Sequence, residues 1–369
     1  MLDLSPLDKV SRLLLTVELK PVQGDRFQPT GFPSLGAATY QTKDGPKLLV
    51  ESAQSMANRL EATCWDTAEN KPVTALVGIS HVTVMRGKDK DNKPRFLTDS
   101  MLEAHRLNSP YMLNSSDRSF LDRFLDELRA RLGEEVVNSN NGLINRNGLA
   151  LALVKFDIGS LIHGVFLSNK VKLKSTDGKP DSIAGGRLRV ARALSAFIEA
   201  SGAAVAASGG VKNDTVNPSG DTSLGFGNVP FARDEYVADR IDCQINLDLA
   251  QIRGYGLELK VQKLLILLAL YRVRKLLDGD LRLRTACDLE PVDRDNLVAS
   301  RPAGFKLPSL TDLESAVQAS ITECKDLMVN TTVTFEDELK KAKDEKKPKA
   351  DDADDSGDDE DNDTENDDN

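Results

Sequence analysis

The chain has 369 residues, a net charge of −10 and a hydrophobic content of 40%, which is enough to build a sizeable core. Its four cysteines, at positions 64, 243, 287 and 324, form no CxxC pair, which argues against a disulfide scaffold and a thiolate zinc site. The N-terminus has no basic segment ahead of an apolar run, and the longest apolar stretch, Leu264 to Tyr271, has eight residues. We therefore expect neither a secreted nor a membrane-spanning protein, but one located in the cytoplasm.

The negative charge is concentrated at the C-terminus. Twelve acidic residues and no lysine or arginine lie between Asp351 and Asn369, which leaves 48 basic against 46 acidic residues in 1–350. Such a segment cannot bury apolar surface, so we expect one folded domain over 1–335 and a disordered, charged tail over 336–369. The near-neutral body can still carry a basic stripe that binds nucleic acid.

The spacing of apolar residues predicts the elements of the first 140 residues. In chain order they are a strand over 12–20, a Gly/Pro-rich loop over 21–36, a helix over 48–63, a strand over 74–85 kinked at Gly78, a polar loop or mobile hairpin over 86–95, and a helix over 116–131 ended by Gly133.

The second half of the chain predicts a similar mixture. Its elements are a strand over 149–156, an alternating strand over 166–174, a helix over 187–201, a long functional loop over 208–230, a strand over 241–249, a helix over 257–277, a strand over 281–287, and a last helix opened by Ser309 with Asp312 close to a capping box. The order matches the βαββαβ order of a ferredoxin-like or RRM-like sheet. We therefore expect an α+β fold whose palm of this kind carries long insertions.

The strongest nucleic-acid signal is the stretch 170–192, which holds seven basic and two acidic residues. The basic residues are Lys170, Lys172, Lys174, Lys179, Arg187, Arg189 and Arg192. Lysines at alternate strand positions share a face on which each can neutralise a phosphate. The arginines would open the predicted helix after two glycines, where backbone N–H groups can also hold an anion. A solvated basic edge strand is the alternative interpretation.

Two further segments carry polar groups, and each has an ordinary structural explanation beside the functional one. Ser55, Asn58 and Arg59 share a helix face, and His105 and Arg106 precede a turn. The chain lacks the GxxxxGK[ST], HExxH and GxSxG motifs, and its histidines have no partner at metal-ligand spacing. We therefore expect no catalytic residue, no metal and no cofactor, and hence no enzyme.

Several segments together resemble a known family. They include VELKPVQGDRFQPTGFPSLGAATY, LVESAQSMANRLE, HRLNSPYM, RALSAFIEASG, GGVKND, GNVPFAR, INLDLAQIRGYG and RLRTACDLE. In this order, over most of 11–290, they are similar to the RAMP-superfamily backbone subunit of type I-G (formerly I-U) CRISPR effectors. The resemblance implies an RRM-like palm with finger and thumb insertions, assembled in several copies along a CRISPR RNA within a prokaryotic Cascade surveillance complex.

The resemblance also implies partners and contact residues. The partners are the guide RNA, target DNA paired with that guide, other copies of the chain, the large and Cas-five/Cas-six-type Cascade subunits and the helicase-nuclease, with no membrane. It places guide contacts on Arg26, Asn58, Arg59, His105, Arg106, Gly209, Gly210 and Lys212, while Lys170, Lys172, Lys174, Arg187, Arg189 and Arg192 rest mainly on charge. The segments 86–95, 170–186 and 211–230 are the candidates for the thumb.

Two alternatives remain open at this point. Related type III backbone subunits cut target RNA with a thumb aspartate, and the candidate insertions contain Asp89, Asp91, Asp177, Asp181 and Asp214. The chain could instead be a generic single-strand RNA-binding protein. A metal-dependent cleavage assay distinguishes the first alternative, and the identity of copurifying RNA distinguishes the second.

Overall fold

The computed structural model describes residues 2–32, 36–88, 90, 92–116, 118–139, 142–172 and 180–336. Its largest sheet has seven strands in the order β18-β19-β1-β17-β14-β5-β4, and every neighbouring pair is antiparallel. These strands are β1 (Arg12–Pro21), β4 (Thr39–Thr42), β5 (Gly45–Glu51), β14 (Leu194–Ser201), β17 (Arg240–Asp248), β18 (Leu281–Arg284) and β19 (Cys287–Pro291). The expected α+β class is confirmed, as are the predicted strands over 12–20 and 241–249.

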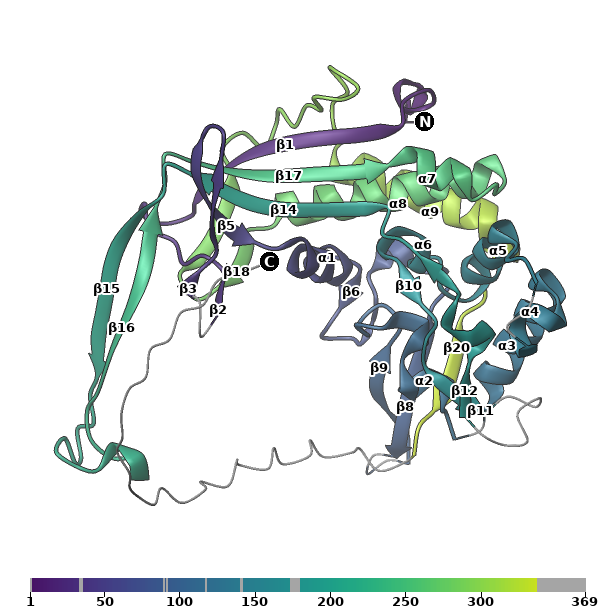
Figure 1. Cartoon of the computed structure of the whole chain (residues 1–369), viewed down its shortest axis with the longest axis horizontal. Helices are drawn as coiled ribbons and strands as arrows, with labels where there is room; N and C mark the ends of the chain where they lie inside the picture. Colours follow the sequence, from purple (N-terminus) through teal and green to yellow (C-terminus); the bar gives the residue numbers. More distant parts are fainter. Residues whose placement is uncertain are drawn as a thin grey trace, which may run out of the picture. The chain divides into compact units, whose positions relative to one another are not determined.

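The centre of this sheet follows from alternation in the sequence. In β1 every second residue from Leu13 to Leu19 is buried while Thr16 and Glu18 are exposed, and β17 alternates in the same way. The helices α1 (Ala53–Ala62), α8 (Leu259–Asp278) and α9 (Leu310–Cys324) build the core: α1 packs on β14 and α8, and α9 packs on α8 (Figure 1). The long helix predicted over 257–277 is therefore confirmed.

Helix α9 also begins as the sequence predicts. The Ser309 hydroxyl accepts a hydrogen bond from the Asp312 backbone N–H at 3.2 Å and lies 2.6 Å from the Asp312 carboxylate. This satisfies one of the N–H groups that the first helical turn leaves without a partner.

Ser309→Ala is expected to lower the free energy of unfolding by about 1 kcal/mol, because it removes this cap. Urea denaturation of both proteins measures the difference. Thr311→Ala, at an exposed position of the same first turn, is the control and should shift stability by less than about 0.5 kcal/mol. Equal losses in the two variants would contradict the capping role.

A second group of elements lies between β5 and β14 in sequence. It contains β8 (Val82–Lys88), β9 (Pro94–Asp99), α2 (Pro110–Leu113), α3 (Ser119–Leu132), α4 (Glu134–Ser139), α5 (Arg146–Asp157), α6 (Ser160–His163), β10 (Val165–Phe166), β11 (Lys170–Lys172), β12 (Pro180–Ser182) and β13 (Arg189–Val190). β8 and β9 form a hairpin that is longer than the polar loop or mobile hairpin predicted over 86–95. β8 also pairs with β20 (Thr331–Thr334), which makes a three-stranded sheet. Helix α3 ends at Gly133, whose φ of +95° favours glycine, and packs on α5 through Phe120, Phe124 and Phe156.

The remaining regular elements are short or peripheral. They are β2 (Gly31–Phe32), β3 (Gly36–Ala37), β6 (Trp65–Asp66), β7 (Lys71–Pro72), α7 (Leu249–Gly254), and 3₁₀ turns at Ser5–Leu7, Thr74–Leu76, Arg106–Asn108, Ile183–Gly186, Thr222–Leu224 and Lys325–Leu327. All four cysteines are free and buried. Among the described helices, none combines the length and the apolar character needed to cross a bilayer.

Two predicted elements have the wrong type. Residues 149–156 belong to helix α5, which Asn145 caps by accepting the Gly148 N–H at 3.1 Å. A buried helix is apolar on most sides, so its sequence looks like that of a buried strand. Residues 187–201 are not a helix but the strands β13 and β14. In β14 the exposed Phe197 lies between buried residues. Because Phe197 is apolar although exposed, the sequence showed the apolar spacing of a helix.

Four predicted elements also differ from the structure in their bounds. The helix expected over 48–63 begins only at Ala53, because Ser52 caps it and β5 occupies the preceding residues. The strand expected over 74–85 begins at Val82, after a 3₁₀ turn and Gly78, whose φ is +94°. The strand expected over 281–287 divides into β18 and β19, and the one expected over 166–174 divides into β10 and β11. The predicted tail lies outside the described residues apart from Glu336.

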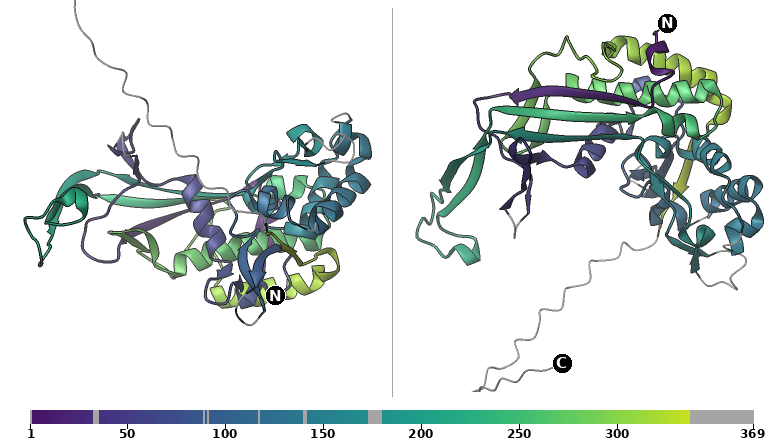
Figure 2. Two further views of the ribbon diagram at one scale, coloured as in Figure 1. Left: turned by 90° about the horizontal axis from the view of Figure 1, so that it is seen from below. Right: turned by 45° about the horizontal axis from the view of Figure 1, so that its top comes forward.

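The segment predicted as a long loop over 208–230 is the connection of a two-stranded ribbon: 213–228 join the two strands, and 208–212 and 229–230 belong to the strands themselves. Strands β15 (Ala204–Lys212) and β16 (Val229–Val237) pair along their full length, and Figures 1 and 2 show this ribbon beyond the end of the sheet. A Cβ at Gly209 would lie 2.9 Å from the Phe231 carbonyl oxygen, and one at Gly210 would lie 3.3 Å from the Phe231 ring. The glycines that suggested a loop thus make room for Phe231 in the partner strand.

Candidate nucleic-acid interface

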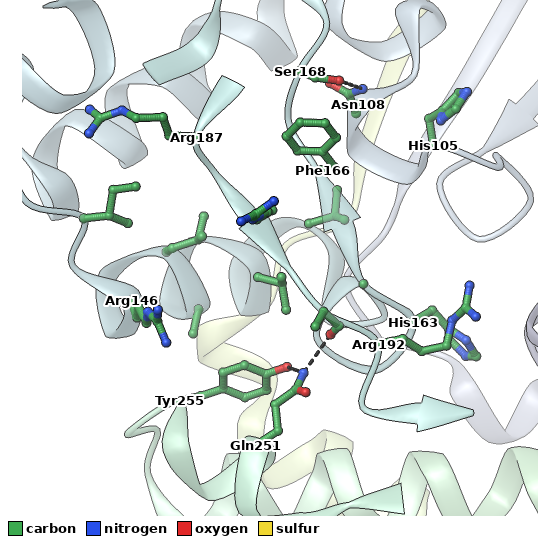
Figure 3. Close-up of a pocket in the computed structure, with 18 of the residues that line it drawn as sticks. His105, Asn108, Arg146, His163, Phe166, Ser168, Arg187, Arg192, Gln251 and Tyr255 are labelled. Atoms are coloured by element: carbon green, nitrogen blue, oxygen red, sulfur yellow. Dashed lines mark hydrogen bonds between the residues drawn. The ribbon is translucent and has the colours of Figure 1, made fainter. Parts of the chain in front are cut away.

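An open groove of about 1500 Å³ lies among α5, the ribbon β10–β13 and α7 (Figure 3). Its lining includes the basic or titratable side chains His105, Arg146, His163, Arg187, Arg189 and Arg192. No aspartate or glutamate is among the described residues that line it. A groove with four arginines and no carboxylate attracts a polyanion because nothing in its wall cancels their charge.

Arg146 and Arg189 are the arginines of this groove best placed to meet a ligand. Both are exposed, Arg146 at the first turn of α5 and Arg189 on β13. Within the part of the chain that the structure describes, neither side chain has an ion-pair partner. Arg189 lies opposite Phe166 across the β10–β13 ribbon, and the Phe166 side chain is 51% exposed. The ribbon therefore presents a cation beside an accessible aromatic ring, a combination that suits a nucleotide.

The other two arginines stabilise the walls of the groove. Arg187 donates hydrogen bonds to the carbonyl oxygens of Ala184 at 3.2 Å and Gly142 at 3.3 Å. Arg192 donates to the Ala53 carbonyl oxygen at 3.3 Å and to Gln54 Oε1 at 3.1 Å, which ties the segment before β14 to the start of α1. Burial lowers the pKa of Arg192. Because these arginines lie in and around strands, the predicted anion site at a helix N-terminus is wrong.

The floor of the groove is fixed by hydrogen bonds from α7. Gln251 Nε2 donates to the Ala191 carbonyl oxygen at 2.7 Å and to the Tyr255 hydroxyl oxygen at 2.6 Å (Figure 3). The Tyr255 hydroxyl in turn donates to the Leu161 carbonyl oxygen at 2.8 Å. Burial raises the pKa of Tyr255 to about 12, so its hydroxyl stays a neutral donor. This chain of bonds joins α7 to α6 and to Ala191, the residue that follows β13.

The predicted pair His105-Arg106 is divided by the fold. His105 is exposed and lines the groove. Arg106 is 3% exposed, and its guanidinium forms ion pairs with Asp157 at 2.8 Å and with Glu61. Its φ of +49° turns the chain so that neighbouring residues face opposite ways. Arg106 therefore joins α1 to α5 inside the protein instead of presenting its charge to solvent.

The predicted face of α1 is divided in the same way. Ser55 and Arg59 do share a face, but both bond to the buried Glu51, Arg59 through Nε at 2.8 Å. Arg59 also donates to the carbonyl oxygens of Arg282, at 3.0 Å, and Leu283. Asn58 is exposed. Arg59 is thus held between α1 and β18, and on this helix face only Asn58 is left at the surface.

Five of the remaining predicted contacts lie on other elements and do not line the groove. Arg26 is exposed in the loop after β1, Lys170 is exposed on β11, and Gly209, Gly210 and Lys212 belong to β15. Lys172 is in β11, while Lys174 and Lys179 lie outside the described residues. The groove thus gathers His105, Arg187, Arg189 and Arg192 from the predicted set. None of the fourteen predicted contacts is tested by these placements, and RNA binding by each stays a prediction.

Three groove residues were not predicted. Arg146 precedes the segment 149–156, which was interpreted as a strand, and His163 lies between that segment and the strand expected over 166–174. Phe166 was counted only as one apolar residue of that alternating strand. Arg146 sits one residue after the cap Asn145, so a correct helix prediction would have drawn attention to it. No sequence signal distinguishes His163, because its surroundings come from distant segments. In the described ranges, no cluster of three or more His, Cys, Asp or Glu side chains could hold a metal ion.

The ribbon β15–β16 forms a second surface with an unusual composition. Seven of its large apolar side chains, counting the connecting loop, are exposed to solvent: Val205, Val211, Val216, Leu224, Phe226, Val229 and Phe231. At the tip, Asp214 accepts the backbone N–H groups of Val216 and Asn217, each at 2.9 Å, and of Gly227 at 2.8 Å. These hydrogen bonds lower the pKa of Asp214. The tip is therefore internally ordered, and its apolar groups lack cover within the described chain.

Comparison with known proteins identifies a family. Residues 13–205, slightly more than half of the chain, match the family model described as CRISPR-associated protein GSU0053 (Cas_GSU0053). No curated protein matches. Among solved structures, a chain of a "CRISPR RNA-guided surveillance complex, pre-nicking" is 12% identical, with 80% of this chain and 75% of that chain covered and a TM-score of 0.31. Csc2 of Thermofilum pendens is 8% identical, with 87% and 79% covered and a TM-score of 0.31. With TM-scores this low, neither structure supports a conclusion about this chain.

Proposed function

The chain belongs to the family of CRISPR-associated protein GSU0053, and from that premise we propose that it is a CRISPR RNA-binding backbone subunit of a type I-G Cascade surveillance complex. Several copies bind side by side along one guide RNA and present its bases for pairing with target DNA. The groove with four arginines, two histidines and no carboxylate carries this proposal, because it suits the phosphates of a nucleic-acid strand and reads no sequence. Pairing with the target then supplies the specificity.

The sheet supports an RRM-like palm within this proposal. The strands and helices β1, α1, β14, β17, α8 and β19 follow one another in the βαββαβ order, with other elements inserted. In the sheet, the four strands stand in the order β19-β1-β17-β14, in which the first and last of the chain are neighbours. The elements between α1 and β14 would then be the fingers, and the groove lies between them and α7.

Of the three candidate thumbs, we assign the ribbon β15–β16. The hairpin β8–β9 is covered on one side by β20, and β11–β12 is a short pair within the finger elements. The ribbon β15–β16 pairs with no further strand and exposes aromatic and aliphatic side chains such as Phe226 and Phe231. Such side chains can pack against unstacked bases. Within the assembly, the other partners are the large and Cas-five/Cas-six-type subunits and the helicase-nuclease.

Sequencing the RNA that copurifies with the protein tests this function. The expected result is a uniform population of guides that carry repeat-derived ends, in amounts that correspond to one guide for several protein copies. A mixture of cellular RNAs would contradict the proposal and support a generic single-strand-binding protein. The double variant Arg146→Ala/Arg189→Ala, purified in parallel, should recover less RNA if the groove holds the guide.

We also propose that the protein does not cleave nucleic acid. Guide-complementary RNA and DNA, incubated with the protein and Mg²⁺ or Mn²⁺, are expected to stay intact. The Asp214 carboxylate is engaged by three backbone N–H groups of its own loop, which supports a structural role. Asp89, Asp91 and Asp177 lie outside the described residues. The type III-like alternative would be established by a metal-dependent cleavage that one Asp→Ala change abolishes, either at one of these three positions or at Asp181 or Asp214.

A further inference from the structure

The inner wall of the groove contains buried nitrogen atoms without hydrogen-bond partners. His163 lines the groove, is 7% exposed, and has no described partner for either Nδ1 or Nε2. Arg192 lines the groove beside it, and its Nε is also buried without a described partner (Figure 3). Buried polar atoms in native proteins almost always have a partner. Because an arginine Nε is a donor and each imidazole carries at least one N–H, this wall lacks an acceptor.

Positive charge exceeds negative charge among the groups that surround His163. Three guanidinium groups act on it, those of Arg106, Arg192 and Arg272. The charge of Arg106 is compensated by Asp157 and Glu61. Among the described residues, the oxygens that hold Arg192 are all neutral. Arg272 is 1% exposed. Within the described part of the chain, its Nε donates to the Cys64 sulfur at 3.0 Å and its buried Nη1 has no partner.

His163 is therefore neutral in the free protein. Burial is the main cause, and repulsion from Arg272, Arg106 and Arg192 adds to it; together they hold the pKa of His163 well below its ordinary value of 6.5. An anion beside Arg192 would supply the missing acceptor and weaken that repulsion. Both effects favour the protonated imidazole.

We propose that His163 and Arg192 form an anion subsite of the groove that takes one phosphodiester of bound RNA, and that His163 takes up a proton when this phosphodiester binds. The inference rests on the proposed RNA-binding function and adds a position and a proton linkage to it. Charge and protons balance in this step: the phosphodiester brings one negative charge, the solvent supplies one proton, and His163 becomes an imidazolium. No covalent bond to the RNA forms or breaks.

The sign of the pH dependence follows from this linkage. The pKa of His163 is higher in the complex than in the free protein, so the complex binds more protons wherever the pH lies between the two values. RNA affinity therefore rises as the pH falls through that interval, by at most about tenfold for each unit of pH.

The pH dependence that His163 causes must be distinguished from any effect of a second histidine in the groove. His105 also lines the groove and is exposed, so its imidazole is accessible to bound RNA as well. His81, the third histidine, lies 2.7 Å from Asp99 and does not line the groove. The experiments accordingly use His105→Gln as the background. Glutamine at either position keeps a hydrogen-bonding amide and removes titration in this range.

Calorimetry with a short polyuridine RNA, in buffers of different ionisation enthalpy, measures proton uptake directly. His105→Gln should still take up protons on binding, at up to one per RNA-bound groove, whereas His105→Gln/His163→Gln should take up none. The NMR signal of the His163 ring in His105→Gln should move toward its protonated position as RNA is added. This second measurement does not depend on the folding of any His163 variant.

The results of these measurements distinguish the anion subsite from the proposed RNA-binding function. RNA binding with equal proton uptake in the single and double variants, or with an unmoved His163 ring signal, overturns the subsite and leaves the RNA-binding function intact. Failure of the unaltered protein to bind RNA overturns both.

Discussion

Arg106→Ala is expected to lower the free energy of unfolding by about 3–5 kcal/mol, because it removes one partner of a buried ion pair. Asp157 is completely buried and lies 2.8 Å from the Arg106 guanidinium, which Glu61 also contacts. Without Arg106 the Asp157 carboxylate would stay buried, and among the described residues it would keep one donor, the Ser160 hydroxyl at 2.8 Å. Urea denaturation measures the loss.

Arg240 provides a matched control for this prediction. It too pairs with two carboxylates, Glu18 at 2.9 Å and Asp242 at 2.8 Å, but its side chain is 48% exposed. Solvent screens such pairs, so Arg240→Ala should cost no more than about 1 kcal/mol. Similar losses for the two variants would mean that the burial of Arg106 does not set its contribution. An Arg106→Ala protein that stays fully stable but loses RNA binding would restore Arg106 as a guide contact.

Arg146→Ala/Arg189→Ala should weaken binding of any single-stranded RNA by more than about tenfold at moderate salt, whatever its sequence. Each arginine is exposed in the groove, and losing one phosphate contact lowers the slope of log K against log salt by about 0.7. The double variant should therefore show a slope lower by about 1.4. Filter-binding titrations over a salt series give both quantities.

The control for this prediction removes the same charge elsewhere. Arg123, on α3, and Arg282, on β18, are exposed and do not line the groove. Arg123→Ala/Arg282→Ala should change the salt slope by much less than the groove variant. If the two double variants lose affinity equally, RNA responds to the total charge of the protein and the groove is not its site.

Sequence periodicity predicted those parts of the fold that have one clear pattern. Strand β1 alternates from Leu15 to Lys20, α8 has a long apolar pattern, and Ser309 stands where a helix must be capped. The pattern failed where burial removed it. In α5 the helix is buried on most sides, and in β14 small alanines and the exposed Phe197 hid the alternation. In both elements the apolar pattern reflects burial in the folded protein, which a single sequence does not reveal.

The candidate site shows the same division. The density of positive charge in 170–192 directed attention to Arg187, Arg189 and Arg192, and all three line the groove. Charge density could not show which of these arginines are already engaged. Arg106 finds its carboxylates 45 and 51 residues away in the chain, and His163 owes its neutrality to three arginines from separate elements. Such partners are visible only in three dimensions.

The burial of every cysteine makes the protein convenient for site-specific labelling. Cys64, Cys243, Cys287 and Cys324 are at most 1% exposed, and burial raises the pKa of Cys243 to about 12 and that of Cys287 to about 11. Because the thiolate is the form that reacts with maleimides, these side chains should stay unmodified while the protein is folded. Val216, near the tip of the ribbon β15–β16, is 92% exposed. A fluorophore attached through Val216→Cys would therefore report on the ribbon alone, in a protein that keeps all its native thiols.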